Sequence, residues 1–300
     1  MNYNNHHFKN LLSKPVMNLV KDIVDSVHYL SPIKNQFFRR NVKYEIEDYV
    51  IGIIDVLKNN ISWNSYNGLI QGNTLRKKHS EWTKLGIYEH VYKKSLNKYL
   101  KGTSITDELK YQSIDSTFVE DKNGSKEATY NKIYKRRKGE SSKGIKITSV
   151  VTSKGVPISV EIHPAHKHDA PLLPEVVNKC VINCNTLKYC NHNRYKQYFL
   201  GDSGYDSKKN NNFLIAKGYS PIICPNRRNT KNKKLIRKLN VKQKKIYKKR
   251  TIVENYHSWI KKFPKIHLLY EHNLENYKGL LLIAISIIIH RRILINKNQK

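Results

Sequence analysis

The spacing of apolar residues changes near residue 110, and this change restricts the fold more than any other feature of the sequence. Before it, apolar residues recur at helical spacing, and after it, short segments rich in β-branched and aromatic residues are typical of strands. Such segments lie at 112–118, 144–152, 156–162, 197–201 and 221–224, with helices expected at about 169–181, 206–217 and 246–263. Consecutive strands followed by alternating helices and strands predict an α/β (α+β) domain in which helices flank a mixed sheet.

The first 108 residues carry the helical pattern. We expect helices at 44–57, 73–86 and 88–100, the second of them ended by Gly86. The sequence therefore predicts a small all-helical N-terminal domain, residues 1–108, followed by a second domain, residues 109–296. Short helices with a Gly-containing turn suit a DNA-binding bundle of the helix-turn-helix kind, and they suit equally well a bundle whose basic face is simply solvated.

The chain is strongly basic, because 56 Lys and Arg face 23 Asp and Glu, giving a formal net charge of +33 over 300 residues. A chain that repels itself this strongly needs a polyanionic partner to offset the field, and nucleic acid is the usual one. The coding bias of an AT-rich genome would also make Lys, Asn, Ile and Tyr abundant. It does not explain, however, why the chain tolerates a net charge whose self-repulsion destabilises a compact fold.

Two further features bear on where the protein works. Four cysteines, at 180, 184, 190 and 224, follow no disulfide framework, and the first residues lack the apolar core of a signal peptide. Both indicate a reducing, intracellular setting with DNA: a prokaryotic cytoplasm and nucleoid, a nucleus or a virus factory. The apolar run Leu280–Ile289 is about half the length that spans a bilayer, so we expect a buried core helix and no membrane.

Two aspartates stand at unusual positions. Asp115 lies within an otherwise uncharged strand, and Asp202 follows the apolar strand that ends at Gly201. A carboxylate in such a place is costly unless it is paired or bound to a cation.

A third acid lies on the long helix expected at 246–263. At about 100° per residue, one arc of roughly 60° holds four polar side chains, Tyr247, Arg250, Glu254 and Lys261. An adjacent apolar face can pack on the sheet. Because Arg250 and Glu254 are four residues apart, an ordinary exposed salt-bridge stripe explains the pattern equally well when the helix is taken alone.

Taken together, the three acids favour a catalytic interpretation. Two strand-end aspartates and a helix glutamate can converge on two divalent cations about 4 Å apart, which activate a water or 3′-hydroxyl for in-line attack at phosphorus. Oxygen-only ligands suit Mg²⁺ or Mn²⁺. The candidate catalytic and metal-binding residues are therefore Asp115, Asp202 and Glu254, and the residues that would hold DNA phosphates are Tyr247, Arg250 and Lys261.

These residues resemble the motifs of the DDE insertion-sequence transposases. Tyr247-x2-Arg250-x3-Glu254-x6-Lys261 matches the Tyr-Arg-Glu-Lys signature of that family at every spacing. Ile114-Asp115-Ser116-Thr117 is similar to its first aspartate motif and Gly201-Asp202-Ser203-Gly204-Tyr205-Asp206 to its second, and the likeness covers about residues 40–295. The resemblance implies an RNase H-like catalytic fold with Asp115, Asp202 and Glu254 as the metal ligands.

Other residues compete for these roles. Asp169 and Asp206 are explained more simply as caps of the helices that follow them. The set Cys180, Cys184, Cys190 and His192 lacks the usual spacing of a zinc knuckle, so free thiols are expected, and His163, His166 and His168 suit a polar turn after a strand. A Gly-rich phosphate loop of the Walker kind is also missing from the sequence, which argues against an ATP-driven mechanism.

The resemblance predicts an enzyme that binds terminal inverted repeats, nicks the DNA to expose a 3′-hydroxyl and joins that end to target DNA. No covalent enzyme–DNA intermediate is expected, because metal-held carboxylates activate external nucleophiles. Bringing two ends of double-stranded DNA together implies a homodimer in the DNA complex. Two alternatives stay open: a catalytically silent, transposase-derived DNA-binding protein, and an RNase H-like nuclease.

Overall fold

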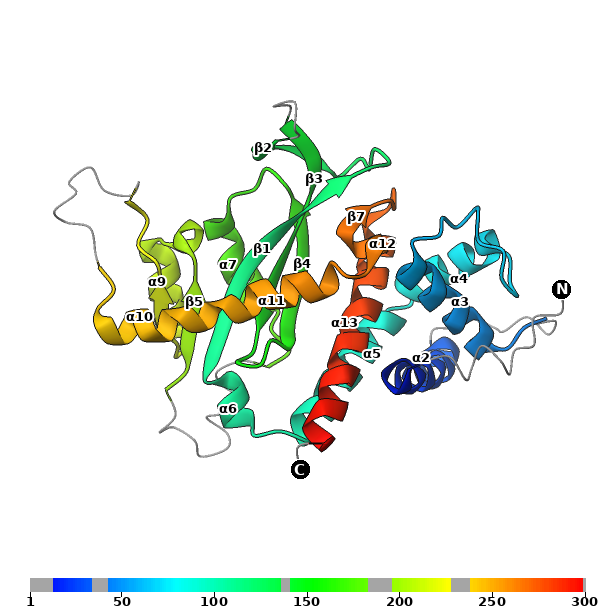
Figure 1. The fold of residues 1–300 in the computed structure, drawn as a ribbon, viewed down its shortest axis with the longest axis horizontal. Helices are drawn as coiled ribbons and strands as arrows, with labels where there is room; N and C mark the ends of the chain where they lie inside the picture. Colours follow the sequence, from blue (N-terminus) through cyan, green and yellow to red (C-terminus); the bar gives the residue numbers. More distant parts are fainter. Residues whose placement is uncertain (1–12, 34–42, 136–140, 183–195, 228–237, 299–300) are drawn as a thin grey trace. The chain divides into compact units, whose positions relative to one another are not determined.

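The structure is a computed structural model that describes residues 13–33, 43–135, 141–182, 196–227 and 238–298. Its contacts divide the chain into two compact units (Figure 1). Unit 1 is Met1–Gly102, Lys122–Lys126 and Trp259–Lys300, and unit 2 is Thr103–Asp121 and Glu127–Ser258. Along the chain, unit 2 is therefore inserted into unit 1.

Unit 1 is built almost entirely of helices, as the sequence predicted for the N-terminal residues. Helix α3 begins with a capping box between Glu45 and Asp48 and buries the apolar residues that recur at helical spacing. Gly86 lies in the left-handed region (φ 73°) between two helices, which confirms it as a helix stop. The elements are α2 (Lys14–Ile33), α3 (Ile46–Asn59), α4 (Gly72–Lys84), α5 (Ile87–Lys101), α12 (Pro264–His267), β7 (Leu268–Leu269) and α13 (Leu274–Asn298).

Helix α13 supplies much of the core of unit 1. Its run Leu280–Ile289 is buried, which confirms the expected core helix, and it packs against α5, α2 and α4. A Cβ added at Gly279 would lie 2.6 Å from Thr83 Oγ1, so the absence of a side chain there permits the close approach to α4. The helix is long and apolar enough to cross a membrane, but 67% of its most apolar window is buried inside the protein.

The packing of α13 changes the boundary expected from the sequence. We assigned residues 109–296 to one domain, whereas residues after Ser258 group with the N-terminal helices. An apolar helix needs a partner, but its own sequence does not say which part of the chain provides that partner.

Unit 2 contains the predicted mixed sheet. Each segment expected as a strand from the sequence is a strand in the structure, and one edge strand, β2, is additional. The elements are α6 (Ile105–Leu109), β1 (Tyr111–Asp121), β2 (Thr129–Lys135), β3 (Ser141–Val151), β4 (Pro157–Pro164), α7 (Asp169–Asn178), β5 (Tyr198–Gly201), the 3₁₀ turn η1 (Ser203–Tyr205), α9 (Lys208–Ala216), β6 (Ser220–Ile223), α10 (Val241–Tyr247), the 3₁₀ turn η4 (Lys248–Arg250) and α11 (Thr251–Ile260).

The strand order places β1 in the middle of the sheet. The order is β2-β3-β1-β5-β6, and β4 also pairs with β3. β1 runs antiparallel to β3 and parallel to β5, and β5 runs parallel to β6. This mixed sheet, with helices on both of its faces, confirms the predicted RNase H-like fold class.

Helices cover both faces of the sheet. In Figure 1, α10 and α11 lie in front of the strands, and α7 and α9 lie behind them. The helix expected at 246–263 is divided, because η4 interrupts it between α10 and α11 and lies against β1. The turn therefore separates Tyr247 from the regular helix that carries Glu254.

Candidate active site

Two of the three candidate acids lie side by side on neighbouring strands. Ser113 of β1 pairs with Leu200 of β5 in parallel register. Continuing that register by two residues sets Asp202 level with Asp115. A Cβ at Gly201 would lie 3.4 Å from Ile114, so the strands remain in close contact up to this point. The sheet itself therefore brings the two aspartates together.

Glu254 reaches this place through Arg250. The Arg250 guanidinium lies 2.5 Å from Glu254 Oε1 and 3.6 Å from Asp115 Oδ2. It is only 18% exposed, whereas the Glu254 side chain is 49% exposed. The guanidinium thus joins the helix glutamate to the strand aspartate, with Arg250 toward the sheet and Glu254 half exposed.

Burial dominates the electrostatics of the cluster. Desolvation raises the pKa of Asp115 to about 6, while Arg250 and the Ser116 N–H oppose the rise and Asp202 and Glu254 add to it. Burial also raises the pKa of Asp202, against the hydrogen bond that its carboxylate accepts from Gly204 N at 2.9 Å. Both carboxyl groups therefore gain from a nearby positive charge.

Two further residues lie at the cluster: His257, which had not been singled out from the sequence, and Tyr205, which had been named only as part of the second aspartate motif. His257 is 6% exposed, and its Nδ1 lies 4.0 Å from Asp115 Oδ2. Tyr205 is fully buried, and its hydroxyl lies 2.9 Å from Ser116 Oγ, which in turn lies 2.9 Å from Thr148 Oγ1. Since Ser116 follows Asp115 and Tyr205 follows Asp202, this chain of hydroxyls ties the two acid-bearing segments together.

The spacing of His257 from Glu254 was a usable signal for its place in the cluster. His257 lies three residues after Glu254, so a helix sets both side chains on neighbouring parts of one surface. The contact of Tyr205 with Ser116 had no such signal, because it depends on how two distant segments pack.

The competing aspartates have other partners. Asp169 forms an ion pair at 2.9 Å with Lys146, whose side chain is 8% exposed. Asp206 accepts hydrogen bonds from Asn226 N at 2.8 Å and from Asn211 Nδ2. The expected capping roles were wrong, since the caps are His168 for α7 and Ser207 for α9. Asp169 nevertheless stays close to the cluster, because it contributes to the raised pKa of Asp202.

The remaining phosphate-binding candidates divide between the units. The ring of Tyr247 lies 5.8 Å from the Arg250 guanidinium, which places this tyrosine beside the acids. Lys261 belongs to unit 1, and burial lowers the pKa of its ammonium. Within unit 2 the structure thus gathers Asp115, Asp202, Glu254, Arg250 and Tyr247.

The alternative metal clusters find no support in the described residues. Cys180 is a buried free thiol whose pKa desolvation raises to about 12, whereas Cys184, Cys190 and His192 lie outside the described residues. His163 is buried on β4, and His166 Nδ1 lies 3.0 Å from Thr129 Oγ1.

The three acids suit a hard cation by their chemistry, although they lie further apart here than the ligands of a bound ion. Across the described ranges, no group of three or more His, Cys, Asp or Glu side chains is close enough to hold a metal ion. The donors at the cluster are carboxylates, which Mg²⁺ and Mn²⁺ prefer. Asp115 and Asp202 each have a raised pKa and so would gain from a cation. The donor set therefore fits the predicted ions.

Comparison with known proteins gives a family match. The family model described as "Transposase DDE domain" matches residues 110–289, which include all six residues singled out from the sequence. No curated protein and no solved structure matches the chain.

Proposed function

Because this chain belongs to the transposase DDE domain family, we propose that it cuts and joins DNA strands at the ends of an insertion sequence, using Asp115, Asp202 and Glu254. The observation that carries the proposal is the gathering of three acids, distant in sequence, around Arg250 in unit 2. Terminal inverted repeats and target DNA are the proposed substrates.

Asp115, Asp202 and Glu254 would hold two divalent cations, Mg²⁺ or Mn²⁺. When bound, such ions activate the attacking oxygen and stabilise the leaving oxygen during in-line attack at phosphorus. The raised pKa of Asp115 supports this role, because it means that Arg250, at 3.6 Å, does not fully offset the cost of burying the carboxylate. A cation bound there would lie beside the guanidinium and would compete with it for the carboxylate oxygens.

Arg250 and Tyr247 would hold the scissile strand. A guanidinium binds phosphate oxygens through a fork of donors, and the stacked tyrosine adds a hydroxyl. Lys261, a further part of the matched signature, would add a phosphate contact. The hydroxyl chain through Ser116 and Tyr205 fixes the two aspartates relative to each other and needs no contact with DNA.

A catalytically silent DNA-binding protein is the second candidate. The observation in its favour is that Arg250 already pairs with both Asp115 and Glu254, while no described group is spaced to hold a metal. It would keep the fold and the basic charge without Mg²⁺-dependent cleavage.

A homodimer on paired DNA ends is proposed for the active form, since two ends must meet.

The deciding experiment compares Asp115→Asn and Glu254→Gln with the wild type in a Mg²⁺-dependent nicking and joining assay. Each variant should fall to about a hundredth of wild-type cleavage or less while duplex binding is retained. Glu120→Gln, on the same strand as Asp115, is the matched control and should cut normally.

The products separate the candidate functions. Wild-type nicking followed by joining to a second DNA identifies the transposase, and nicking without joining identifies a nuclease. Wild-type-like cleavage by both acid variants would remove these carboxylates from the mechanism, and a wild type that binds DNA without cutting it would favour the silent protein.

A further inference from the structure

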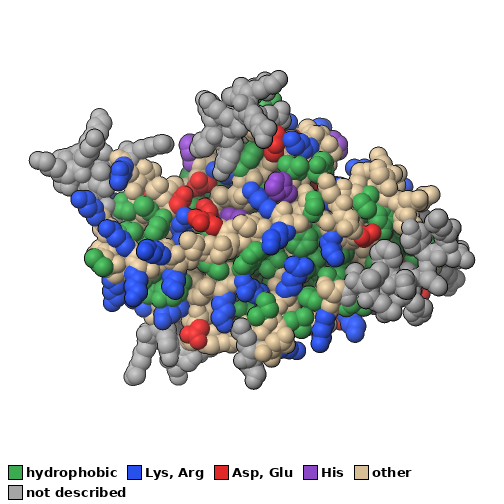
Figure 2. Space-filling view, in the orientation of Figure 1, with side chains coloured by type: hydrophobic (Ala, Val, Ile, Leu, Met, Phe, Trp, Pro, Cys, Tyr) green, Lys and Arg blue, Asp and Glu red, His purple; other side chains and the backbone are tan. Residues whose placement is uncertain are grey.

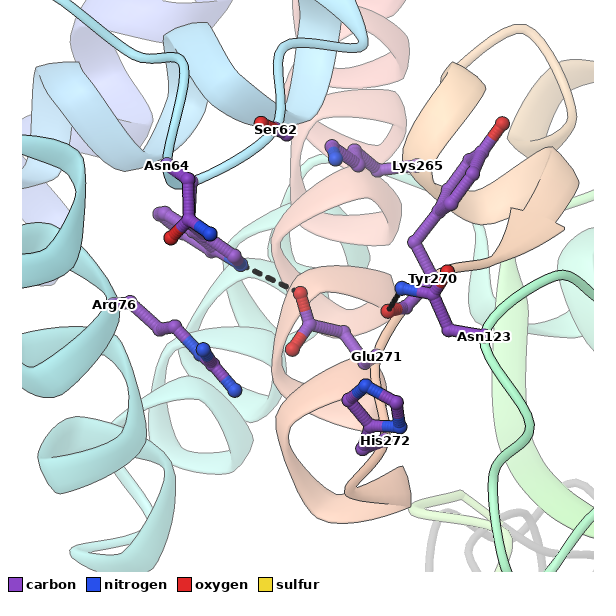
Figure 3. A pocket seen from close by; sticks show the side chains of 9 residues that line it. Ser62, Asn64, Arg76, Asn123, Lys265, Tyr270, Glu271 and His272 are labelled. Atoms are coloured by element: carbon purple, nitrogen blue, oxygen red, sulfur yellow. Dashed lines mark hydrogen bonds between the residues drawn. The ribbon is translucent and has the colours of Figure 1, made fainter.

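Unit 1 contains a pocket of about 290 Å³ that no residue of the acid cluster lines (Figure 3). Its volume is close to the lower end of ligand pockets, which is about 300 Å³. The pocket is rich in hydrogen-bond donors, and those that matter here are Ser62, Asn64, Arg76, Asn123 and Lys265.

One wall of the pocket is rigid. The buried Trp63 donates from Nε1 to Glu271 Oε1 at 2.6 Å and stacks on the ring of His79 at 5.7 Å. His79 is itself held between Tyr88 Oη and the Asn276 carbonyl. One of the dashed lines in Figure 3 ends at Glu271 and marks the hydrogen bond that this carboxylate accepts. The pocket is therefore formed in advance of any ligand.

Lys265 is the unusual residue of this pocket. It is only 5% exposed, yet its ammonium makes no hydrogen bond and no ion pair with any residue that the structure describes. The ammonium lies over the ring of Tyr270, with Nζ 5.0 Å from the ring centroid, in a cation–π contact. An ammonium with so little exposure and no such partner among the described residues is costly, so an anion bound in the pocket would stabilise it. Burial lowers the pKa of Lys265, and the Glu271 carboxylate opposes this only in part.

Arg76 adds a second cation. It is exposed, comes from α4, and has no ion pair among the described residues. In Figure 3 the side chains of Arg76 and Lys265 enter from separate helices, with Glu271 between them and bonded to Trp63. Two cations with hydroxyl and amide donors match a tetrahedral oxyanion, and a guanidinium in particular suits phosphate.

We propose that this pocket binds a phosphate group of the DNA backbone, and so anchors DNA to unit 1 away from the acid cluster. The identity of the phosphate as part of DNA rests on the proposed function, whereas the affinity of the pocket for phosphate does not. Lys265 and Arg76 bind the phosphate oxygens, and Asn64 and Asn123 supply neutral donors.

The first test uses the full chain and inorganic phosphate. Thermal unfolding is followed in phosphate and in chloride at equal ionic strength for the wild type, Lys265→Met and the matched control Lys262→Met. Lys262 is exposed, lies three residues away and does not line the pocket. Phosphate should raise the Tm of the wild type and of the control by more than that of Lys265→Met, since the general stabilising effect of phosphate acts on all three proteins alike. In chloride, Lys265→Met should be the most stable, because it removes an unpaired buried charge.

The second test measures binding to a short duplex as salt is varied. Lys265→Met should bind about tenfold more weakly than Lys262→Met, with a slope of log K against log salt shallower by about 0.9. Lys265→Arg should recover most of the affinity. Arg76→Gln, with Lys77→Gln as its control, provides an exposed substitution that leaves the core intact and should show the same pattern.

Equal phosphate response and equal duplex affinity in the Lys265 and Lys262 variants would overturn the proposal. Phosphate protection that depends on Lys265, with unchanged duplex binding, would reject DNA as the source and leave a free phosphate. Neither readout needs strand cleavage, so failure of the pocket and failure of the proposed catalysis are distinguished: a chain that never nicks DNA can still lose phosphate binding in Lys265→Met.

Discussion

At the scale of single residues, Asp115 is the acid of the cluster on which opposing effects are clearest. Its side chain is 20% exposed; desolvation raises the pKa of its carboxyl, and the Arg250 guanidinium lowers it. The sequence placed Asp115 in a strand and Asp202 at a strand end, and the sheet register follows from that. Contacts such as that of Tyr205 with Ser116 were not predictable, because a local pattern does not report which side chains meet across a fold.

The charge of Asp115 has a consequence for stability without metal. A carboxyl whose pKa is raised in the folded protein favours folding when protonated, and that contribution is complete below 3.8 and lost as the pH rises through about 6. At pH 8 in EDTA, Asp115→Asn should therefore raise the free energy of unfolding by up to about 3 kcal/mol, and the Tm with it. This difference in stability from the wild type should become smaller toward pH 5. Thermal unfolding at both pH values measures it, and a variant less stable than wild type at pH 8 would contradict the argument.

At the scale of helices and strands, the sequence was informative where an element has a strong apolar pattern. The helices expected at 44–57, 73–86 and 88–100 and the inner strands were found in place, whereas α2 had not been assigned. The strand β2 was not expected either, since an edge strand of mixed Tyr, Asn and Lys needs no apolar run. The break at η4 was also missed. A 3₁₀ turn advances about 120° per residue rather than 100°, so it shifts Tyr247 by roughly 60° but leaves Arg250 and Glu254 in register.

Three helices of unit 1 meet at one buried carboxylate. Asp22 of α2 is 2% exposed, forms an ion pair with Lys98 of α5, and lies 3.2 Å from both Lys94 Nζ and His290 Nε2 of α13. Burial raises the pKa of Asp22, but the hydrogen bonds from His290 and Lys98 and the charges of the two lysines together outweigh it and hold the pKa well below its ordinary value.

Asp22→Asn should lower the free energy of unfolding at neutral pH by about 2 kcal/mol, a value reduced because the two lysines are partly solvated. A lowered pKa gives stability that is present above 3.8 and declines as the pH falls below it. The difference from wild type should therefore narrow in acid. Urea unfolding at pH 7 and pH 3.5 measures this, with Asp25→Asn, an exposed site one turn away, as the control. A constant difference across that range would show that the ionised carboxylate is not responsible.

At the scale of the whole molecule, positive charge is the dominant property. Figure 2 shows Lys and Arg side chains spread widely over one face, in keeping with a net charge of +33. The charge was evident from composition, the mixed sheet from the strand pattern, and the RNase H-like fold from the resemblance of the motifs. The grouping of residues after Ser258 with the N-terminal helices was not, because nothing local in an all-round apolar helix names its distant partner.

The charge predicts how DNA binding responds to salt. Each phosphate contact that is lost should make the slope of log K against log salt shallower by about 0.9. Arg250→Ala and Lys261→Ala should each show this decrease together with weaker binding, whereas Lys58→Ala, at an exposed site on α3, should not. Duplex titrations at several salt concentrations measure the slopes. If both signature variants keep the wild-type slope, neither side chain touches the backbone.

The insertion of one unit within the other sets an order for biosynthesis. A ribosome completes Thr103–Ser258 before it makes α13, so the catalytic fold can form while α2, α4 and α5 still lack the helix that packs against them. The helical unit closes only after translation has passed the inserted one. A nonsense mutation between Ser258 and the start of α13 at Leu274 would therefore release a chain whose acids are all present but whose N-terminal helices keep bare apolar surfaces, a natural target for chaperones and proteases.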